Sequence, residues 1–370
     1  MAGALLTAQV LAAAAAGAVL RVGPQHELKT PSAAAKVARD GDTVEIEAGV
    51  YPRDAAVWWQ SNLTIRAIGG HAHLRADGAH AEGKAIWVIK GAQTTIEGIE
   101  FSDARVSDRN GAGIRLEGPG LTVRRCYFHH NENGILTGAD LTSDIVVEHS
   151  EFAHNGHAHN IYVGTVRSFT LRYSYVHHAI IGHNVKSRAI KNYITYNRIM
   201  DERDGRASYA IDLPDGGLSF VMGNLIQQGP ENDNRAVVAY GAEGYKNPLN
   251  ELYFVSNTVV NDDPLGGRFF FIRPGADAIR IVNNLFSGPG ELRVKNAEFR
   301  NNRQIAKKDF AGPLDFDYRL KAGAPGIGDG VDAGSRYGYV LRPAAEYLHP
   351  LRVRPRRASG PLDLGALEFR

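Results

Sequence analysis

One pattern of polar and apolar positions occurs seven times between residues 120 and 290. A short run of strand-forming residues is followed by a small residue, any residue and then a large apolar residue. The small residues lie 24, 24, 23, 27, 33 and 27 positions apart, and a repeat in this range is typical of a solenoid. The small residues are Cys126, Ser150, Ser174, Asn197, Asn224, Asn257 and Asn284.

The repeat predicts an all-β chain folded as a right-handed parallel β-helix. A rung of about 23 residues accommodates three short strands, and equivalent residues stack about 4.8 Å apart. The small residues then form one internal file at a tight bend, where Asn tolerates left-handed geometry and hydrogen-bonds to its neighbours above and below. Membership of this file accounts for Cys126 without a chemical role. Separate αβ units are disfavoured, since helical periodicity is scarce between residues 90 and 290.

The N-terminal segment differs from the repeat. Residues 1–20 are apolar and Ala-rich, which predicts a signal peptide with a cleavage region at 16–18. No basic residue precedes Arg21, and a membrane anchor is the alternative. The rest is expected to be one domain, with an N-terminal cap at about 21–60, a coil at about 60–300 and a tail at about 300–370.

The cap is expected to include a short helix. Thr30 is a suitable N-cap before Pro31, and the Ala-rich residues 33–39 continue the helix. Such a helix covers the open end of the coil, where strand edges and apolar core would otherwise be exposed.

Charge and cysteine content narrow the classes of partner. The net charge is +2 and no nucleic-acid motif is present, so we expect no nucleic-acid partner. The single cysteine excludes an intramolecular disulfide framework. We expect a secreted or periplasmic monomer with no stable membrane insertion after processing.

Polar residues crowd three successive rungs where the repeat does not require them. The His-Asn pairs at 159–160 and 183–184 lie 24 residues apart, and are expected to stack on one face. Strand alternation then points Tyr162 and Lys186 outward together, with Asp212 outward from the next rung.

These rungs are also rich in cationic side chains. Lys186 and Arg188 flank one serine, with several histidines nearby, and like charges on one surface require an anionic partner. This cluster favours an acidic polysaccharide as the partner. Longer steps in the repeat place insertions at 201–207, 229–235, 241–250 and 261–268.

No metal or other cofactor is predicted. The histidines lack a helical i, i+4 pair or a cysteine partner, which disfavours zinc. Calcium is the alternative, because carboxylates are present, but no known loop pattern organises them. These carboxylates are Asp201, Glu202, Asp204 and Asp212.

Three segments outside the repeat carry a family resemblance. Residues 20–51, 317–325 and 360–368 resemble the parallel β-helix proteins of the pectate lyase-like superfamily, in particular secreted polysaccharide-degrading members. The resemblance implies the fold. It leaves the reaction open, since this fold also carries hydrolases, epimerases, esterases and phage tailspikes.

The central rungs resemble a narrower group. Residues 182–217 are similar to the chondroitinase-B and alginate lyase family, and Lys186 matches the lysine that serves as catalytic base there. The catalytic arginine of that family has no counterpart, because Asp212 stands at the best-matching position. The acidic calcium ligands are also missing, and Ala179 and Ile181 lie near their places.

A β-elimination on a uronic acid needs a group that neutralises the carboxylate, a base and an acid. Arg188 or His183 is the candidate for the first role, Lys186 for the second, and Tyr209, Tyr162 or His159 for the third. We therefore predict the catalytic residues Lys186, Arg188, His183, Tyr209 and Asp212. We predict the substrate-binding residues His159, Asn160, Tyr162, His178, Asn184, Arg203 and Arg206.

The favoured function is thus a polysaccharide lyase. Two alternatives remain open at this stage. A glycoside hydrolase of the β-helix type requires paired carboxylates, and Asp201, Asp204, Asp212 and Asp215 are available. A carbohydrate-binding adhesin without catalysis requires exposed aromatic platforms, for which the pair at 58–59 is the candidate.

Overall fold

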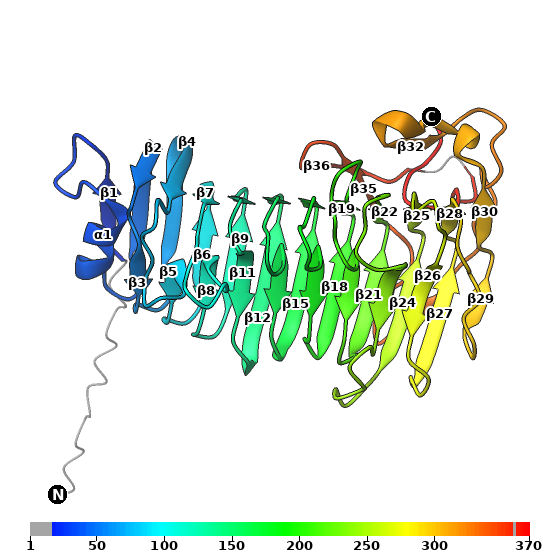
Figure 1. Ribbon diagram of the computed structural model, residues 1–370, viewed down its shortest axis with the longest axis horizontal. Coiled ribbons are helices and arrows are strands. Elements are labelled where there is room, and N and C mark those ends of the chain that lie inside the picture. The colour runs from blue at the N-terminus through cyan, green and yellow to red at the C-terminus, as the bar shows by residue number, and fades with distance from the viewer. Residues whose placement is uncertain (1–16, 358–359) are drawn as a thin grey trace, which may run out of the picture.

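The computed structural model describes residues 17–357 and 360–370 (Figure 1). Its strands stack into an elongated coil in which each rung contributes up to three short strands. Strands of successive rungs pair in parallel, so each position in a rung builds a continuous row. We number the rows 1 to 3 in the order in which the chain visits them within a rung.

Row 1 is a nine-stranded sheet that positions the site described below. It consists of β3 (Ala56–Trp58), β5 (Ala85–Ile89), β8 (Ala112–Leu116), β11 (Asn133–Thr137), β14 (Ile161–Val163), β17 (Val185–Ser187), β20 (Ile211–Leu213), β23 (Ala236–Tyr240) and β26 (Arg268–Ile272).

Rows 2 and 3 merge in the first rungs, where two long strands span both. Row 2 consists of β1 (Val19–Val22), β2 (Thr43–Pro52), β4 (Thr64–Arg75), β6 (Thr94–Glu97), β9 (Leu121–Arg124), β12 (Asp140–Glu148), β15 (Val166–Arg172), β18 (Lys191–Thr195), β21 (Leu218–Met222), β24 (Glu251–Val255), β27 (Ala278–Val282) and β29 (Glu298–Arg300). Row 3 adds β7 (Ile99–Ser102), β10 (Tyr127–His129), β13 (Glu151–Ala153), β16 (Tyr175–His177), β19 (Arg198–Met200), β22 (Leu225–Gln228), β25 (Thr258–Asn261), β28 (Leu285–Ser287) and β30 (Arg303–Ile305).

The seven small residues of the repeat form one buried file, as predicted. Each backbone N–H donates to the side chain of the next member, for example from Ser174 to Asn197 Oδ1 at 3.0 Å and from Asn224 to Asn257 Oδ1 at 2.9 Å. The file continues to Asn302, which the repeat did not reveal. The left-handed backbone conformation was expected at the small residue itself. It occurs instead at the residue before it, such as Tyr196 at φ 58°.

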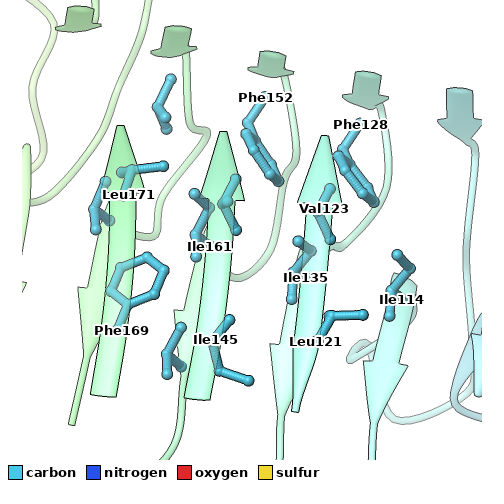
Figure 2. Close-up of a cluster of buried hydrophobic side chains, with 14 of the residues drawn as sticks. Ile114, Leu121, Val123, Phe128, Ile135, Ile145, Phe152, Ile161, Phe169 and Leu171 are labelled. Atoms are coloured by element: carbon cyan, nitrogen blue, oxygen red, sulfur yellow. The ribbon is translucent and has the colours of Figure 1, made fainter. Parts of the chain in front are cut away.

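The large apolar residues of the repeat fill the interior of the coil. Phe128 and Phe152 are fully buried and stack with their ring centroids 4.7 Å apart (Figure 2). They pack against β-branched and aliphatic side chains from the other rows, including Ile135 of row 1 and Leu171 of row 2. Burying one apolar face of every strand is the main source of stability in such a coil.

The N-terminal end is closed by the helix α1 (Pro31–Val37). Thr30 is its N-cap and accepts a hydrogen bond from the backbone N–H of Ala33, which confirms the predicted start. The coil is longer than expected, since its strands run from Val19 to Ile305. The predicted signal peptide overlaps β1 by two residues, and positions 1–16 lie outside the described residues.

The C-terminal segment folds back along the coil (Figure 1). Its buried side chains, such as Tyr347 and Leu364, pack on the outer side of row 3 against Leu225 and Leu285. Leu341 similarly packs against row 2. No helix in the described part of the chain is long and apolar enough to cross a membrane. The segment contains η1 (Lys307–Asp309), β31 (Phe310–Gly312), η2 (Pro313–Asp315), β32 (Asp317–Leu320), β33 (Ser335–Arg336), β34 (Tyr339–Val340), β35 (Ala345–Leu348) and β36 (Arg352–Pro355).

Candidate active site

The outer face of row 1 carries the candidate site. Tyr162, Lys186 and Asp212 are register partners on the neighbouring strands β14, β17 and β20. Their chain neighbours, such as Val185, are fully buried in the core, so alternation points the three polar side chains to the outside. The sequence predicted this arrangement.

Two stacked histidines lie beside this file. The rings of His159 and His183 stack at 4.9 Å, and His183 contacts the ring of Tyr209 at 5.0 Å. The backbone N–H of His183 donates to Nδ1 of His159 at 3.0 Å, and that of Tyr209 donates to Nδ1 of His183 at 3.1 Å. Because Nδ1 accepts, each neutral ring carries its proton on Nε2. Burial is the main cause that lowers the pKa of His159 to about 3 and that of His183 to about 2.

Nε2 of His183 lies 3.3 Å from Oδ2 of Asp212. Asp212 is only 2% exposed, and its other oxygen, Oδ1, is buried without a hydrogen-bond partner among the described residues. Burial, partly offset by the charge of Lys186, raises the pKa of Asp212 to about 6. A carboxyl group with such a pKa can exchange a proton near neutral pH.

Lys186 is covered by neighbouring side chains rather than solvated. Its side chain points outward, but only 9% of the residue is exposed. The Nζ atom lies 3.5 Å from Asp212 Oδ2 and 3.1 Å from Glu243 Oε1, and it sits over the ring of Tyr162. Lys186 therefore contributes to packing as well as to the charge of the site.

Arg188 joins the same network. Its Nε donates to the hydroxyl oxygen of Tyr162 at 2.9 Å, and its terminal nitrogens donate to Asp215 and Glu243, each at 2.7 Å. Lys246 also contacts Asp215, at 3.0 Å. Acidic side chains of the chain itself thus balance these cations, and an acidic partner stays a prediction.

Sequence reasoning missed Glu243. This residue lies on the connection between β23 and β24, inside the insertion predicted at 241–250. Hydrogen bonds from Arg188 and Lys186 outweigh burial and lower the pKa of Glu243, which therefore stays ionised. The only signal in the sequence was the insertion itself, which does not show where its side chains point.

Two residues predicted to bind substrate lie inside the coil. Asn160 and Asn184 are fully buried. The side-chain nitrogen of Asn160 donates to Asn184 Oδ1, and that of Asn184 donates to Asp201 Oδ1. These residues form a second internal file. Each is the last residue of the connection before a row 1 strand, where the chain turns and the side chain points into the coil. The prediction of direct substrate contact was therefore wrong for both.

Three other predicted residues lie away from Lys186. His178 follows row 3 and contacts Asp204 at 3.1 Å. Arg203 donates to the backbone carbonyl of Leu314 in the C-terminal segment, and Arg206 is exposed on the connection between β19 and β20. Substrate contact by these residues stays a prediction.

The carboxylates of the site do not fit a calcium ion. Asp212, Asp215 and Glu243 each contact a cationic side chain. Among the described residues, none of them belongs to a group with metal-ligand geometry. We therefore assign no calcium-dependent step to this site.

Comparison with known proteins places the chain in a structural class. A family model described as the right handed beta helix region matches residues 60–205. The crystal structure of pectate lyase Pel9A is similar with a TM-score of 0.62 and 14% identity, over 95% of this chain and 96% of that chain. ORF18 of Geobacillus virus E2 is similar with a TM-score of 0.44 and 12% identity, over 72% of this chain and 53% of that chain. No curated protein sequence matches the chain.

These findings confirm the predicted right-handed parallel β-helix and its likeness to pectate lyase-like proteins. The narrower resemblance to chondroitinase-B and alginate lyases is not confirmed. At this level of identity the similarity to Pel9A establishes the fold alone.

Proposed function

We propose that this protein is an exported lyase that cleaves an acidic, uronate-containing polysaccharide by β-elimination on the outer face of row 1. The likeness in fold to a pectate lyase supports a polysaccharide substrate. The observation that carries the proposal is the contact between the Lys186 amine and the buried carboxylate of Asp212, next to the guanidinium of Arg188.

Glu243 marks the binding place of the substrate carboxylate. Its two oxygens contact Lys186 and Arg188, as the carboxylate of a uronate would. The Glu243 side chain is 43% exposed on a surface connection, so the substrate can displace it without disturbing the core. Arg188 then neutralises the uronate carboxylate, which makes the proton on C5 more acidic.

Lys186 is the base that removes this proton. It must first lose its own extra proton, and Asp212 is suited to take it, because burial raises the pKa of that carboxyl to about 6. The neutral amine then takes the C5 proton, the electron pair of that bond forms the C4–C5 double bond, and the bond from C4 to its oxygen breaks.

Tyr162 supplies the proton for the leaving oxygen. Its hydroxyl oxygen already accepts a hydrogen bond from Arg188 Nε, so its own proton is directed elsewhere. The same guanidinium stabilises the phenolate that forms when this proton is transferred. The proton gained by Lys186 returns to Tyr162 through solvent after the product leaves, which restores both groups.

Hydrolysis is the second candidate, and one observation favours it. Asp212 is a buried carboxyl with a raised pKa, as expected of a general acid in a glycosidase. Asp215 and Glu243 lie in the same ion-pair network and offer further carboxylates.

A panel of acidic polysaccharides distinguishes these functions. Purified protein is incubated with each polymer, and both reducing ends and the ultraviolet absorbance of unsaturated uronates are measured. The proposal expects both signals to rise together on at least one uronate polymer. Reducing ends without the absorbance, abolished in Asp212→Asn, would identify a hydrolase. Neither signal on any polymer, with binding retained, would identify a carbohydrate-binding protein.

A further inference from the structure

Three histidines converge at a second place on the coil, outside the candidate active site. His177 is the last residue of β16, and His178 begins the connection that follows it. His154 begins the equivalent connection one rung earlier, after β13. One side-chain nitrogen from each of the three lies within 4.8 Å of the others. His177 and His178 are buried, and His154 is half-buried.

The backbone holds these side chains in place. His154 and His178 both adopt the left-handed conformation, with φ of 53° and 50°, which is uncommon for residues with a side chain. Their ring centroids lie 4.8 Å apart with the rings tilted by 37°, and the ring of Tyr175 stacks on that of His177 at 3.8 Å. The imidazoles are thus fixed by both backbone and packing.

The hydrogen-bond partners of these rings leave lone pairs facing one another. Nε2 of His177 lies 3.2 Å from a Glu151 carboxylate oxygen, and Nε2 of His178 lies 3.1 Å from one of Asp204. A carboxylate can only accept, so each Nε2 carries a proton, and in the neutral rings each Nδ1 presents a lone pair. The two Nδ1 atoms are 2.5 Å apart. Two lone pairs at this distance repel, and either a proton shared by the two nitrogens or a metal ion bound to both removes this repulsion.

We propose that His154, His177 and His178 bind a divalent transition-metal ion, with Zn²⁺ as the favoured species. Neutral imidazole is a preferred ligand of zinc, which is bound at about 2.0–2.1 Å and takes three or four protein ligands. Glu151 and Asp204 accept the outer protons of two ligating rings, which is the arrangement that orients metal-bound histidines. Hard cations such as Ca²⁺ prefer oxygen ligands and do not suit this nitrogen set.

The site links two successive rungs close to the candidate active site. His154 and His178 begin the connections that contain His159 and His183, respectively. A metal ion bound to both connections therefore fixes the loops that present the stacked histidines of row 1. Its expected role is structural, and the proposal is independent of the reaction at Lys186.

A second trio on the same side of the coil is the natural comparison. His73, Glu100 and His129 also approach one another. There, however, Nε2 of His73 contacts the hydroxyl of Ser102, and Nε2 of His129 contacts Glu100 itself. The carboxylate of this trio is thus already the partner of one of its own histidines, whereas the first trio consists of imidazoles alone.

The test uses full-length protein without a histidine tag, treated with a chelator. Titration with Zn²⁺ in a calorimeter should show one tight site per chain, and Zn²⁺ should raise the melting temperature. Co²⁺ should give the visible absorption of a nitrogen-ligated site. The double variant His154→Asn/His177→Gln should weaken Zn²⁺ binding by at least about 100-fold, and Glu151→Gln by about 10-fold or more. Asn suits the left-handed backbone at 154, so this variant should fold.

Two control variants locate the site. His157→Asn changes an exposed histidine outside both trios and should leave Zn²⁺ affinity unchanged. His129→Gln disrupts only the second trio and should also retain tight binding. The proposal is overturned if the parent protein binds no Zn²⁺ at micromolar concentrations. It is equally overturned if the double variant binds as tightly as the parent, or if only His129→Gln loses the site.

Discussion

The internal file of small residues and the outer face of row 1 are both built by stacking equivalent residues of successive rungs, yet they follow different rules. Inside, Ser and Asn recur because each buried N–H needs the side chain of the next rung as an acceptor. Outside, the file changes at every rung, from Tyr162 through Lys186 to Asp212. The comparison shows that the fold constrains the interior of each bend, whereas the outer face is free to carry chemistry.

Asn224→Leu is the strongest test of whether the internal file of small residues stabilises the coil. Asn224 Oδ1 accepts from the backbone and side-chain nitrogens of Asn197, and its own nitrogen donates to Asn257 and to the carbonyl of Ile194. Leucine leaves buried groups without partners at about 1–3 kcal/mol each, so the free energy of unfolding should fall by about 2–6 kcal/mol. Urea denaturation followed by circular dichroism measures this. A change below about 1 kcal/mol would mean that the file is dispensable.

A buried carboxyl group on the outer face of row 1 should make the stability of the protein depend on pH. The pKa of Asp212 is raised from 3.8 to about 6, mainly by burial, so the folded state binds this proton more tightly than the unfolded chain does. Its contribution to stability is therefore greatest below pH 4 and is lost as the pH rises through about 6. Asp212→Asn removes this dependence. The unfolding free energy of the variant relative to the parent should rise by up to about 3 kcal/mol between about pH 4 and pH 7. A difference that is constant with pH would show that the Asp212 carboxyl has an ordinary pKa.

Two lysines of the ion-pair network should differ in their effect on stability. Lys186→Met leaves the buried Asp212 without its cation and should cost about 1–3 kcal/mol. Lys246→Met removes a side chain that is 56% exposed and should change stability by less than about 0.5 kcal/mol. Thermal denaturation of both variants checks this. Equal effects would mean that Lys186 is as solvated as Lys246.

The smallest effect is expected for Cys126→Ser. Ser150 and Ser174 occupy the same file, and each hydroxyl donates to the backbone carbonyl two residues earlier. The thiol of Cys126 makes the equivalent contact with Arg124 at 3.3 Å. Serine at 126 should therefore change the unfolding free energy by less than about 1 kcal/mol and leave activity intact. Loss of turnover in a folded variant would assign Cys126 a chemical role.

The repetition inside the coil explains how much of the fold could be predicted from the sequence. The file from Cys126 to Asn284 could be predicted because the same residue types recur at nearly constant spacing. Asn302 was not predicted, because it follows Asn284 by 18 residues, which is a shorter step than the others. The outward direction of Tyr162, Lys186 and Asp212 followed from alternation along the strand.

Residues on the connections could not be placed in this way, because no fixed period governs where they point. Asn160 and Asn184 were taken for outer residues and are internal, since the phase of the strand does not extend into the preceding connection. Glu243 belongs to an insertion, and its contact with Lys186 spans 57 positions. His154 and His178 approach one another only through the stacking of two bends.

The most direct test of the central claim compares Lys186→Met with Lys246→Met on a polysaccharide that the parent protein cleaves. Both variants remove one positive charge from the same network, and methionine retains much of the side-chain volume. Formation of unsaturated uronate, measured as kcat/KM by ultraviolet absorbance, should fall by about 10²–10⁴-fold in Lys186→Met because the base is lost. Lys246→Met should retain activity within about threefold, as expected of an exposed charge outside the reacting atoms. Full activity of folded Lys186→Met would contradict the assignment of this face of row 1 as the site of elimination.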